Sequence, residues 1–464
     1  MGELRGSDLS IVREQLGREP TVPFTVVARC PGGHPLVIRN APVDRDGHPF
    51  PTLFWLTCRV AVKAAARLES QGWIGRWNTR AEKAEVLATA LATAHEEYAR
   101  ERSRGFPQAL AFGGVGGASR GVKCLHAHYA NHVAGGRDPI GEWVAEEIEP
   151  IHPEEKPRRV GVVDLGTNSI RLLVASAGPS EDTGLEEFAR DMIITRIGEG
   201  VDRTGRIDPE ALARTVEVLE RYCRRARALH AERIRVSATA AVREASNRDE
   251  LEASVRTHAG SELEVITGER EAALSFLGAT PGLDAPAPFF VLDIGGGSTE
   301  FAVGTEQPDA SISTPMGSVR LTERLIRTDP PSREELASVQ KAVQDTLGEV
   351  GRSVSVGTAP TFVAVAGTPT TIQAIALGLP FYDPEAIHRS WLSVEEAERV
   401  LAELARMTTD ERSAIPVMAP GRADVIVAGA VILVEVMRRF GFERALVSET
   451  DILDGLALEL LATL

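Results

Sequence analysis

From residue 160 onward, the hydrophobic positions follow two alternating patterns that predict strands and helices in turn. Short apolar runs, typical of buried strands, give way to stretches in which apolar residues recur three and four positions apart, as on one face of a helix. The predicted strands cover residues 160 to 164, 192 to 197, 234 to 238, 262 to 266, 289 to 293 and 362 to 366. The longest predicted amphipathic helix covers residues 209 to 229. This alternation predicts α/β architecture.

The first 150 residues follow a different pattern, which predicts an α+β domain. Helices are expected over residues 9 to 16, 57 to 69 and 81 to 102, and strands over residues 24 to 28 and 35 to 39. The polar, proline-punctuated stretch 151 to 159 predicts a linker. We therefore expect residues 1 to 150 to fold separately and to be dispensable for the chemistry, because the principal motifs follow the linker.

Two stretches beyond the linker share one motif: an apolar strand ending in aspartate, a glycine-containing turn with hydroxyl residues, and a second apolar strand. The first stretch contains Asp164-Leu-Gly-Thr-Asn-Ser169 and the second Asp293-Ile-Gly-Gly-Gly-Ser298. One copy alone is compatible with an ordinary hairpin. The repetition predicts two similar subdomains whose turns face each other across a cleft, over residues 160 to 286 and 287 to 464.

The composition of these turns predicts a phosphate site. Glycines expose backbone N–H groups, and small hydroxyl and amide side chains add further hydrogen-bond donors. The predicted phosphate-binding residues are Gly166, Thr167, Asn168, Ser169, Gly295, Gly296, Gly297, Ser298 and Thr299. Asp164 and Asp293 are the candidate ligands of Mg²⁺ or Mn²⁺, because hard cations take oxygen ligands. Capping of turn N–H groups is the alternative role of the two aspartates.

Both turns resemble the phosphate motifs of the actin, sugar kinase and Hsp70 ATPase superfamily. More narrowly, residues 158 to 464 resemble the exopolyphosphatase and guanosine pentaphosphate phosphohydrolase family. The resemblance implies two duplicated actin-like (ribonuclease H-like) subdomains and hydrolysis of phosphoanhydride bonds. Two positions depart from the family pattern, Ala273 where arginine is expected and Thr450 in the Ser-Glu-x-Asp segment. These departures affect local contacts only.

Two glutamates are the candidate catalytic residues. Glu271 follows a predicted strand and Gly268 at the start of a helix, from which its carboxylate can reach the cleft. It also matches the family's catalytic glutamate, so we expect it to act as the general base on water. Stabilising the helix N-terminus is its alternative role, and Glu269 is the neighbour most easily confused with it. Glu300 matches a second family glutamate, for which the resemblance implies orientation of water or metal.

Further candidates are less specific. Arg171, Arg196 and Arg243 lie near the motifs and are expected to neutralise phosphate charge, although each is also compatible with an ordinary surface residue. Gly367 and Thr368 follow the strand at residues 362 to 366, at the start of a helix whose N-terminus attracts phosphate.

Composition narrows the choice of partners and compartment. The net charge is −15, yet residues 1 to 150 contain 18 basic and 17 acidic side chains, so the acidic excess lies in the remainder. An acidic domain disfavours nucleic acid as the main partner. The four cysteines show no C-x-x-C spacing and no secretory signal precedes the first domain, so we expect a cytoplasmic protein. The apolar run at residues 425 to 434 is too short for a membrane span and predicts a core helix.

A glycine-rich loop in the N-terminal part leads into a helix that carries Cys124, His126, His128 and His132. A metal site with Cys30 or His34 as further ligands is one hypothesis. The alternative is a loop packed on a helix, with histidines bonded to backbone or solvent. This segment also resembles an uncharacterised bacterial domain of unknown function, which names no chemistry.

The favoured function is release of terminal phosphate from inorganic polyphosphate. Conversion of guanosine pentaphosphate to the tetraphosphate, and binding of guanosine polyphosphates without hydrolysis, are the alternatives. A sugar or acetate kinase is disfavoured by Glu271 and the Thr-Asn-Ser turn. Only about ten residues follow Asp454-Gly455, so we expect no extra domain there and a preference for short chains. Whether the chain forms a homodimer is left open.

Overall fold

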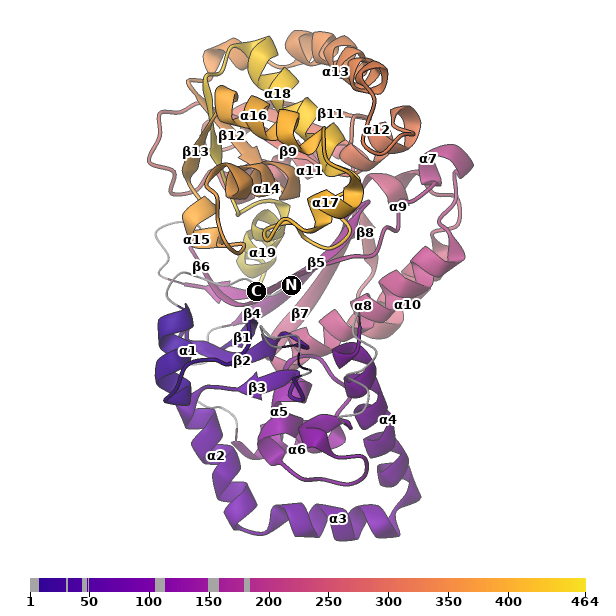
Figure 1. The fold of residues 1–464 in the computed structure, drawn as a ribbon, viewed down its shortest axis with the longest axis vertical. Coiled ribbons are helices and arrows are strands. Elements are labelled where there is room, and N and C mark those ends of the chain that lie inside the picture. Colours follow the sequence, from indigo (N-terminus) through magenta and orange to yellow (C-terminus); the bar gives the residue numbers. More distant parts are fainter. Residues whose placement is uncertain are drawn as a thin grey trace.

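The computed structural model describes residues 8–30, 32–43, 48, 50–104, 113–148, 158–178 and 184–464. Three parts follow one another along the long axis of the molecule: the N-terminal domain, a first α/β subdomain in the middle, and a second at the other end (Figure 1). The predicted linker lies outside the described residues up to position 157, and its last residue, Arg159, is the first residue of a strand.

The first subdomain is built on a five-stranded sheet with the order β6-β5-β4-β7-β8. The strands are β4 (Arg159–Leu165), β5 (Ser169–Ala177), β6 (Leu185–Ile194), β7 (Ala231–Ala238) and β8 (Leu263–Val265). Strands β4, β5 and β6 form an antiparallel meander, whereas β7 runs parallel to β4 and β8 parallel to β7. The prediction of a strand over residues 192 to 197 was wrong at both ends: β6 pairs with β5 from Leu185, and Arg196 adopts a left-handed φ of 55° that a strand cannot include.

The second subdomain repeats this arrangement. Its sheet has the order β11-β10-β9-β12-β14-β13. The strands are β9 (Phe289–Ile294), β10 (Thr299–Gly304), β11 (Pro308–Thr314), β12 (Thr361–Val365), β13 (Ser390–Ser393) and β14 (Arg444–Val447). Again the first three strands form an antiparallel meander and the fourth pairs in parallel with the first. The repeated order confirms the α/β class and the two duplicated subdomains.

Helices cover both sheets. The first subdomain contains α7 (Val201–Thr204), α8 (Pro209–Ala228), α9 (Ala240–Glu244), α10 (Asp249–Ala259) and α11 (Gly268–Ala279). The second contains α12 (Ser318–Leu325), α13 (Arg333–Ser353), α14 (Gly367–Ala376), α15 (Pro384–Ile387), α16 (Val394–Leu404), α17 (Thr409–Ser413), α18 (Ile426–Phe440) and α19 (Ile452–Ala462). The expected core helix is α18, which is buried from Ile426 to Met437. No helix in the described part of the chain is long and apolar enough to cross a membrane.

Helices α11 and α19 are exchanged between the subdomains. Although α19 ends the chain, its apolar residues pack on the first sheet, with Leu453 and Leu456 in one cluster with Val162. In the opposite sense, Phe276 of α11 packs on the second sheet. The two helices contact each other at glycines. A Cβ atom on Gly278 would lie 1.8 Å from the carbonyl oxygen of Asp451, so no larger residue fits at this crossing.

The N-terminal domain is α+β, as expected. Its sheet, β1 (Phe24–Arg29), β2 (Pro35–Asn40) and β3 (Phe54–Leu56), is antiparallel. Its helices are α1 (Asp8–Leu16), α2 (Arg59–Ser70), α3 (Trp73–Lys83), α4 (Glu85–Arg102), α5 (Leu125–Val133) and α6 (Pro139–Ile148). The helix predicted over residues 81 to 102 is interrupted at Ala84, whose backbone is extended, so that α3 and α4 are separate.

The N-terminal domain and the first subdomain share one buried apolar cluster. Tyr129 and Val133 of α5 belong to the same cluster as Leu219 and Tyr222 of α8. Across the same boundary the guanidinium of Arg221 bonds to the carboxylate of Glu101 at 2.8 Å. The two parts therefore share a core, and separate folding of residues 1 to 150 stays a prediction.

Candidate active site

The two glycine turns touch. A Cβ atom placed on Gly297 would lie 2.6 Å from the hydroxyl oxygen of Thr167, and one on Gly296 would lie 3.3 Å from the backbone nitrogen of Asn168. Glycine is therefore required at this contact for steric reasons. The predicted turns of the two subdomains do face each other.

Each turn is held in shape by its own hydrogen bonds. The N–H of Gly166 donates to the carbonyl of Ser169 at 2.9 Å, which closes the first turn. In the second turn the carbonyl of Gly295 accepts the N–H of Ser318, at the start of α12, at 3.0 Å. The predicted phosphate-binding residue Thr299 is different, because its side chain is fully buried and its hydroxyl bonds to the carbonyl of Met316.

Asp164, at the end of β4, lies directly opposite Arg171 on β5. The guanidinium of Arg171 donates to Oδ2 of Asp164 at 2.7 Å and also pairs with Asp451 of the 449–451 loop. Arg171 thus holds two aspartates in place. Burial raises the pKa of Asp164 despite this ion pair. Its Oδ1 is buried and has no hydrogen-bond partner among the described residues.

The equivalent position in the second subdomain carries a carboxylate in place of an arginine. Asp293 of β9 lies directly opposite Glu300 of β10. Asp293 accepts a hydrogen bond of 2.5 Å from the hydroxyl of Ser275, and Glu300 accepts one of 2.7 Å from Ser313. Burial raises the pKa of Asp293 to about 6, and burial together with the charge of Asp293 raises the pKa of Glu300 to about 8.

Glu271 lies in the first turn of α11, and its carboxylate lines the cavity. Burial, followed by the negative charge of Glu300, raises its pKa well above the ordinary value. The guanidinium of Arg243 is 3.4 Å from its Oε2. The N-cap of the helix is the hydroxyl of Thr267, which accepts the N–H of Arg270, and Glu271 lies in the first turn, where its charge also stabilises the helix N-terminus.

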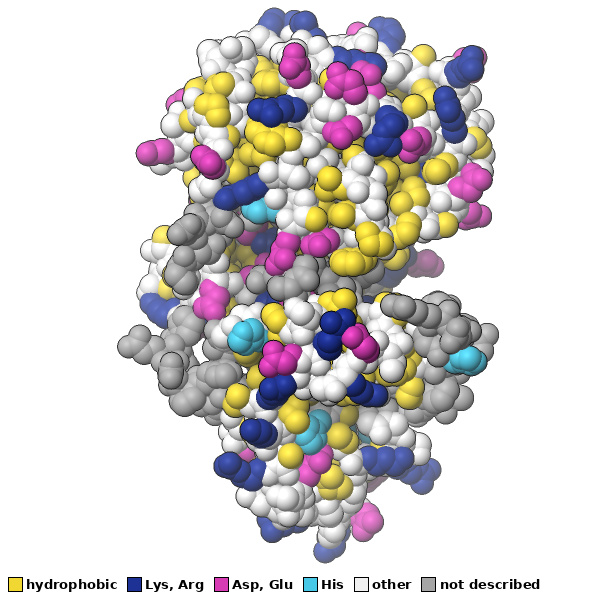
Figure 2. Space-filling view, turned by 60° about the vertical axis from the view of Figure 1, so that its left-hand side comes forward, with side chains coloured by type: hydrophobic (Ala, Val, Ile, Leu, Met, Phe, Trp, Pro, Cys, Tyr) yellow, Lys and Arg dark blue, Asp and Glu magenta, His cyan; other side chains and the backbone are white. Residues whose placement is uncertain are grey.

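These elements surround a cavity of about 900 Å³. In the space-filling view, hydrophobic and acidic side chains face the waist between the second subdomain and the N-terminal domain (Figure 2). The predicted residues that line the cavity are Asp164, Gly166, Thr167, Asn168, Ser169, Arg171, Glu271, Asp293, Gly295, Gly296, Gly297, Ser298, Gly367 and Thr368. The structure therefore brings together residues from both repeats and from the N-terminus of α14.

Four of the predicted residues do not line this cavity: Arg196, Arg243, Thr299 and Glu300. Arg196 pairs with Asp424 at 2.7 Å. Arg243 donates to the carbonyl of Ile266 at 2.8 Å, in addition to its contact with Glu271. The side chain of Arg243 contacts Glu271, which lines the cavity, whereas Arg196 reaches a lining residue only through its backbone N–H, which donates to the carbonyl of Asn168 at 2.9 Å.

Several cavity residues were missed from the sequence. Arg422 lies over the N-terminus of α14, where its Nη1 donates to the hydroxyl of Thr371 at 2.7 Å. It forms no ion pair with any described residue. The hydroxyl of Tyr382, which also lines the cavity, donates to Glu449 at 2.6 Å, and burial raises the pKa of that carboxyl to about 7. The only sequence signal for these three residues was Arg422 itself, a basic residue shortly before the apolar run at residues 425 to 434.

The cysteine and histidine hypothesis needs correction. Among the described residues the one group with three converging metal-type ligands is Glu69, Cys124 and His126. His128 is turned away and bonds to the buried Asp138 at 2.8 Å. Cys30 and His34 do not join the group. The helix face was set by packing on α6, where Gly141 lies against the backbone of His128, and the i, i+4 spacing could not show this.

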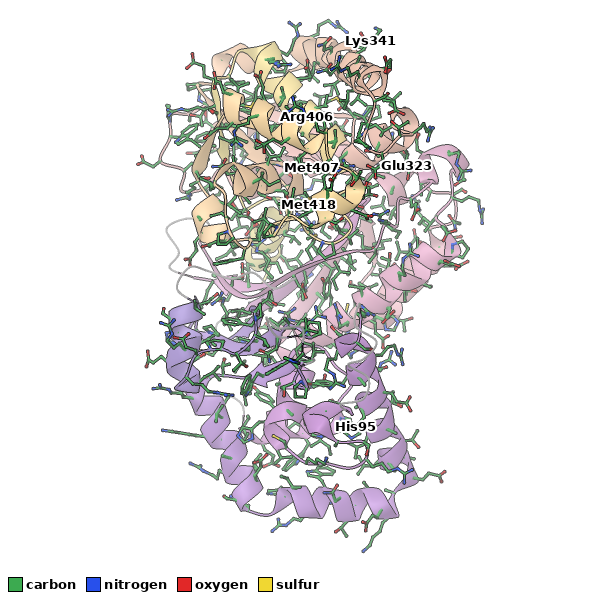
Figure 3. All side chains as sticks on the ribbon, in the orientation of Figure 1. His95, Glu323, Lys341, Arg406, Met407 and Met418 are labelled. Atoms are coloured by element: carbon green, nitrogen blue, oxygen red, sulfur yellow. The ribbon has the colours of Figure 1, made fainter. Side chains whose placement is uncertain are left out.

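The glycine-rich loop before α5 fits the alternative interpretation. His95 of α4 lies inside the N-terminal domain (Figure 3). Its Nδ1 accepts the N–H of Val115 at 3.1 Å, so Nε2 carries the proton and donates to the carbonyl of Gly121 at 2.9 Å. This histidine fixes the loop through backbone contacts.

The fold and this cavity define a protein with two duplicated α/β subdomains, whose glycine turns meet in a cleft between them. The chain belongs to the Ppx/GppA phosphatase family, whose model matches residues 174–464. A second model, for a protein family of unknown function (DUF501), matches residues 26–146.

Similar proteins match mainly the C-terminal two thirds. Exopolyphosphatase 2 of Mycobacterium tuberculosis is 45% identical over 313 residues, which are 65% of this chain and 98% of that protein. The crystal structure of an exopolyphosphatase-like protein is 36% identical with a TM-score of 0.63, over 66% of this chain and 99% of that one. A Ppx/GppA family member from Aquifex aeolicus is 28% identical with a TM-score of 0.56, over 66% and 99%. The match to the M. tuberculosis protein therefore leaves most of the N-terminal domain without a counterpart.

Proposed function

We propose that this protein is a phosphoanhydride hydrolase that releases terminal phosphate from inorganic polyphosphate. The observation that carries the proposal is the convergence of Glu271 and both glycine turns on one cavity, with Thr167 and Gly297 in contact. The similarity to a named exopolyphosphatase supports the same substrate class.

The turns provide the grip on the phosphates. Backbone N–H groups of the glycine turns and the hydroxyls of Thr167 and Ser298 act as donors to neighbouring phosphoryl groups. Arg422 adds a positive charge beside the N-terminus of α14, where helix N–H groups also attract anions. Because Arg171 is held by Asp164 and Asp451, its part is to position these carboxylates.

Glu271 is the group that takes the proton from water. Its carboxylate is buried beside the turns, where the raised pKa makes it a stronger base than an exposed glutamate. The guanidinium of Arg243 contacts this carboxylate. Glu300, which is not in the cavity wall, acts through its charge on Glu271 and Asp293.

A divalent cation, Mg²⁺ or Mn²⁺, fits the donor set of this site. Asp164 offers a buried carboxylate oxygen without a partner, and Asp293 offers a second carboxylate. No three carboxylates of the described residues converge on one point here, which agrees with Mg²⁺ binding through one or two carboxylates, waters and substrate phosphates. When bound, the cation supplies neutralisation of phosphate charge.

Phosphate release from purified protein tests the proposal. Glu271→Gln is expected to lower kcat by about 10² to 10⁴, as for loss of a general base, while substrate binding remains. Glu269→Gln is the matched control, because Glu269 lies two residues earlier and is exposed. Full turnover by Glu271→Gln would remove Glu271 from this role.

Guanosine pentaphosphate is the second candidate substrate, favoured by the apolar part of the cavity wall. Phe381 is 43% exposed there, and Tyr382, Val417 and Phe24 line the same cavity. An inorganic chain leaves such a surface unused, whereas a nucleobase packs against it. The two substrates are separated by kcat/KM measured side by side with ATP as reference. Tight nucleotide binding without phosphate release would indicate a sensor.

A further inference from the structure

The N-terminal domain contributes a wall of the cavity that holds the glycine turns. The wall consists of α1, the segment after it and the start of β1: Leu9, Arg13, Glu19, Pro20, Val22, Pro23, Phe24 and Thr25. We propose that this domain is part of the substrate site, with Arg13 binding a phosphate remote from the scissile bond of an oligophosphate anion. The proposal rests on the proposed hydrolysis for its substrate class.

The wall is firmly attached to the rest of the molecule. Asp8 of α1 and Arg29 of β1 form a buried ion pair with two bonds of 2.8 Å. Val12 packs with Phe24 in a small apolar cluster on the same sheet. Strand β1 in turn packs against β6 of the first subdomain. A wall held in this way is preorganised, so substrate contact costs little ordering of the chain.

The charges of the cavity explain why one more arginine matters. Asp164, Asp293, Glu271 and Glu449 repel a polyanion, and Arg171 is already paired with aspartate. Arg13 is the only basic side chain that the described part of the N-terminal domain contributes to the wall. Its guanidinium lies 2.5 Å from the carboxylate of Glu19, and the side chains are 51% and 68% exposed. A pair this exposed is weak and can be exchanged for a phosphate.

Apart from Glu19 and Thr25, the remainder of the wall is apolar, and it offers no further positive charge to a phosphate. Leu9 is 45% exposed, and Val22 and Phe24 continue the surface. Arg13 therefore marks the last cationic position on this side, and phosphates beyond it gain nothing from the wall. The match to the Mycobacterium tuberculosis relative covers 98% of that protein but only 65% of this chain. That relative therefore has too few further residues for a domain that contains α1. The wall thus distinguishes this chain from that relative.

The test compares charge variants on full-length protein. Arg13→Ala is expected to raise KM for oligophosphates roughly fivefold, and Arg13→Glu is expected to raise it further. In both variants kcat should be unchanged. The salt dependence of KM should become shallower, because one phosphate contact is lost. Arg18→Glu is the matched control: it makes the same change in net charge in the same segment, but Arg18 stacks on Trp55 and does not line the cavity. Leu9→Glu against Leu9→Gln gives a second comparison, in which only the charged variant should weaken binding.

Polyphosphate binding, measured by calorimetry, distinguishes failure of this proposal from failure of the proposed function. In a Glu271→Gln background, added Arg13→Glu should weaken binding of medium-length polyphosphate while added Arg18→Glu does not. If the unaltered protein releases no phosphate, hydrolysis is refuted, and the binding comparison still decides the role of the wall. Equal binding and equal KM for the Arg13→Glu and Arg18→Glu variants would overturn the proposal.

Discussion

Asp293 and Glu300 lie directly opposite each other on the antiparallel strands β9 and β10, both buried and each bonded to a serine. Two like charges at such a cross-strand position repel, and burial adds to the cost of ionising both. In the other repeat the same position holds Arg171 opposite Asp164. The two halves of the site therefore share one backbone arrangement but carry opposite charges at the position that faces the aspartate.

This carboxylate pair predicts that the metal-free protein loses stability as pH rises. The folded-state pKa is about 8 for Glu300 and about 6 for Asp293, both raised, so the folded protein binds more protons than the unfolded chain. Stability is then fully present below the ordinary glutamate range and is lost as pH rises toward 8. In chelator, Glu300→Gln should have a higher Tm than the unaltered protein at pH 8 and a similar Tm at pH 4. The exposed Glu306→Gln is the control, and a gain of Tm that is equal at both pH values would contradict the explanation.

Asp293→Asn should raise the Mg²⁺ concentration needed for half-maximal phosphate release. Losing one carboxylate of a cation site weakens metal affinity, by roughly 10- to 100-fold even where the lost group only supports a ligand. A Mg²⁺ titration of activity measures this, with Asp309→Asn on the exposed part of β11 as control. An unchanged Mg²⁺ requirement at full activity would exclude Asp293 as a ligand.

Arg422→Ala should raise KM for polyphosphate, and the free energy of substrate binding that it removes should exceed its effect on the free energy of unfolding. Arg422 is the cavity arginine without an ion pair among the described residues, so its charge is available to substrate. A charge-assisted contact of this kind contributes roughly 1.5 to 3 kcal/mol, which corresponds to a KM about 10- to 100-fold higher. Arg439→Ala, on the exposed end of α18, is the control. If both variants have the same KM, Arg422 does not bind phosphate.

Gly278→Ala should lower Tm, whereas Gly348→Ala should raise it or leave it unchanged. At Gly278 the new methyl group would meet the backbone of Asp451 at the crossing of α11 and α19, and backbone cannot move cheaply. At Gly348, in α13, the new methyl group would make only an ordinary contact of 3.9 Å with the Arg352 side chain, and alanine favours a helix by roughly 0.5 to 1 kcal/mol over glycine. Thermal denaturation of both variants measures the difference. A Tm for Gly278→Ala equal to that of the unaltered protein would show that the helices can separate slightly without cost.

The parts of the site that the sequence predicted correctly are those encoded locally. A strand, an aspartate and a glycine turn lie within ten residues of one another, so the two turns and their contact could be inferred from repetition alone. The place of Glu271 at the cavity follows in the same way from its position after a strand, and its role as the general base stays a prediction. The family resemblance then added the expected chemistry, which is hydrolysis of phosphoanhydride bonds.

The residues that were missed depend on long-range packing. Arg422 and Tyr382 reach the cavity because α14, α15 and α18 of the second subdomain pack together, and no local pattern indicates that arrangement. The wall around Arg13 depends on β1 packing against β6 across the domain boundary. The metal hypothesis for His128 failed for the same reason. Its side chain bonds to the buried Asp138, and the sequence pattern did not indicate that contact.

The exchange of α11 and α19 has a consequence for any attempt to divide the chain. A break between residues 286 and 287 would leave each half without the helix that covers one face of its sheet, because that helix belongs to the other half. The separated halves would each expose a row of apolar side chains and would re-associate in order to cover them. The two halves therefore behave as interlocked pieces, and opening of the cleft must occur by bending at the crossing of these helices without separation of the halves.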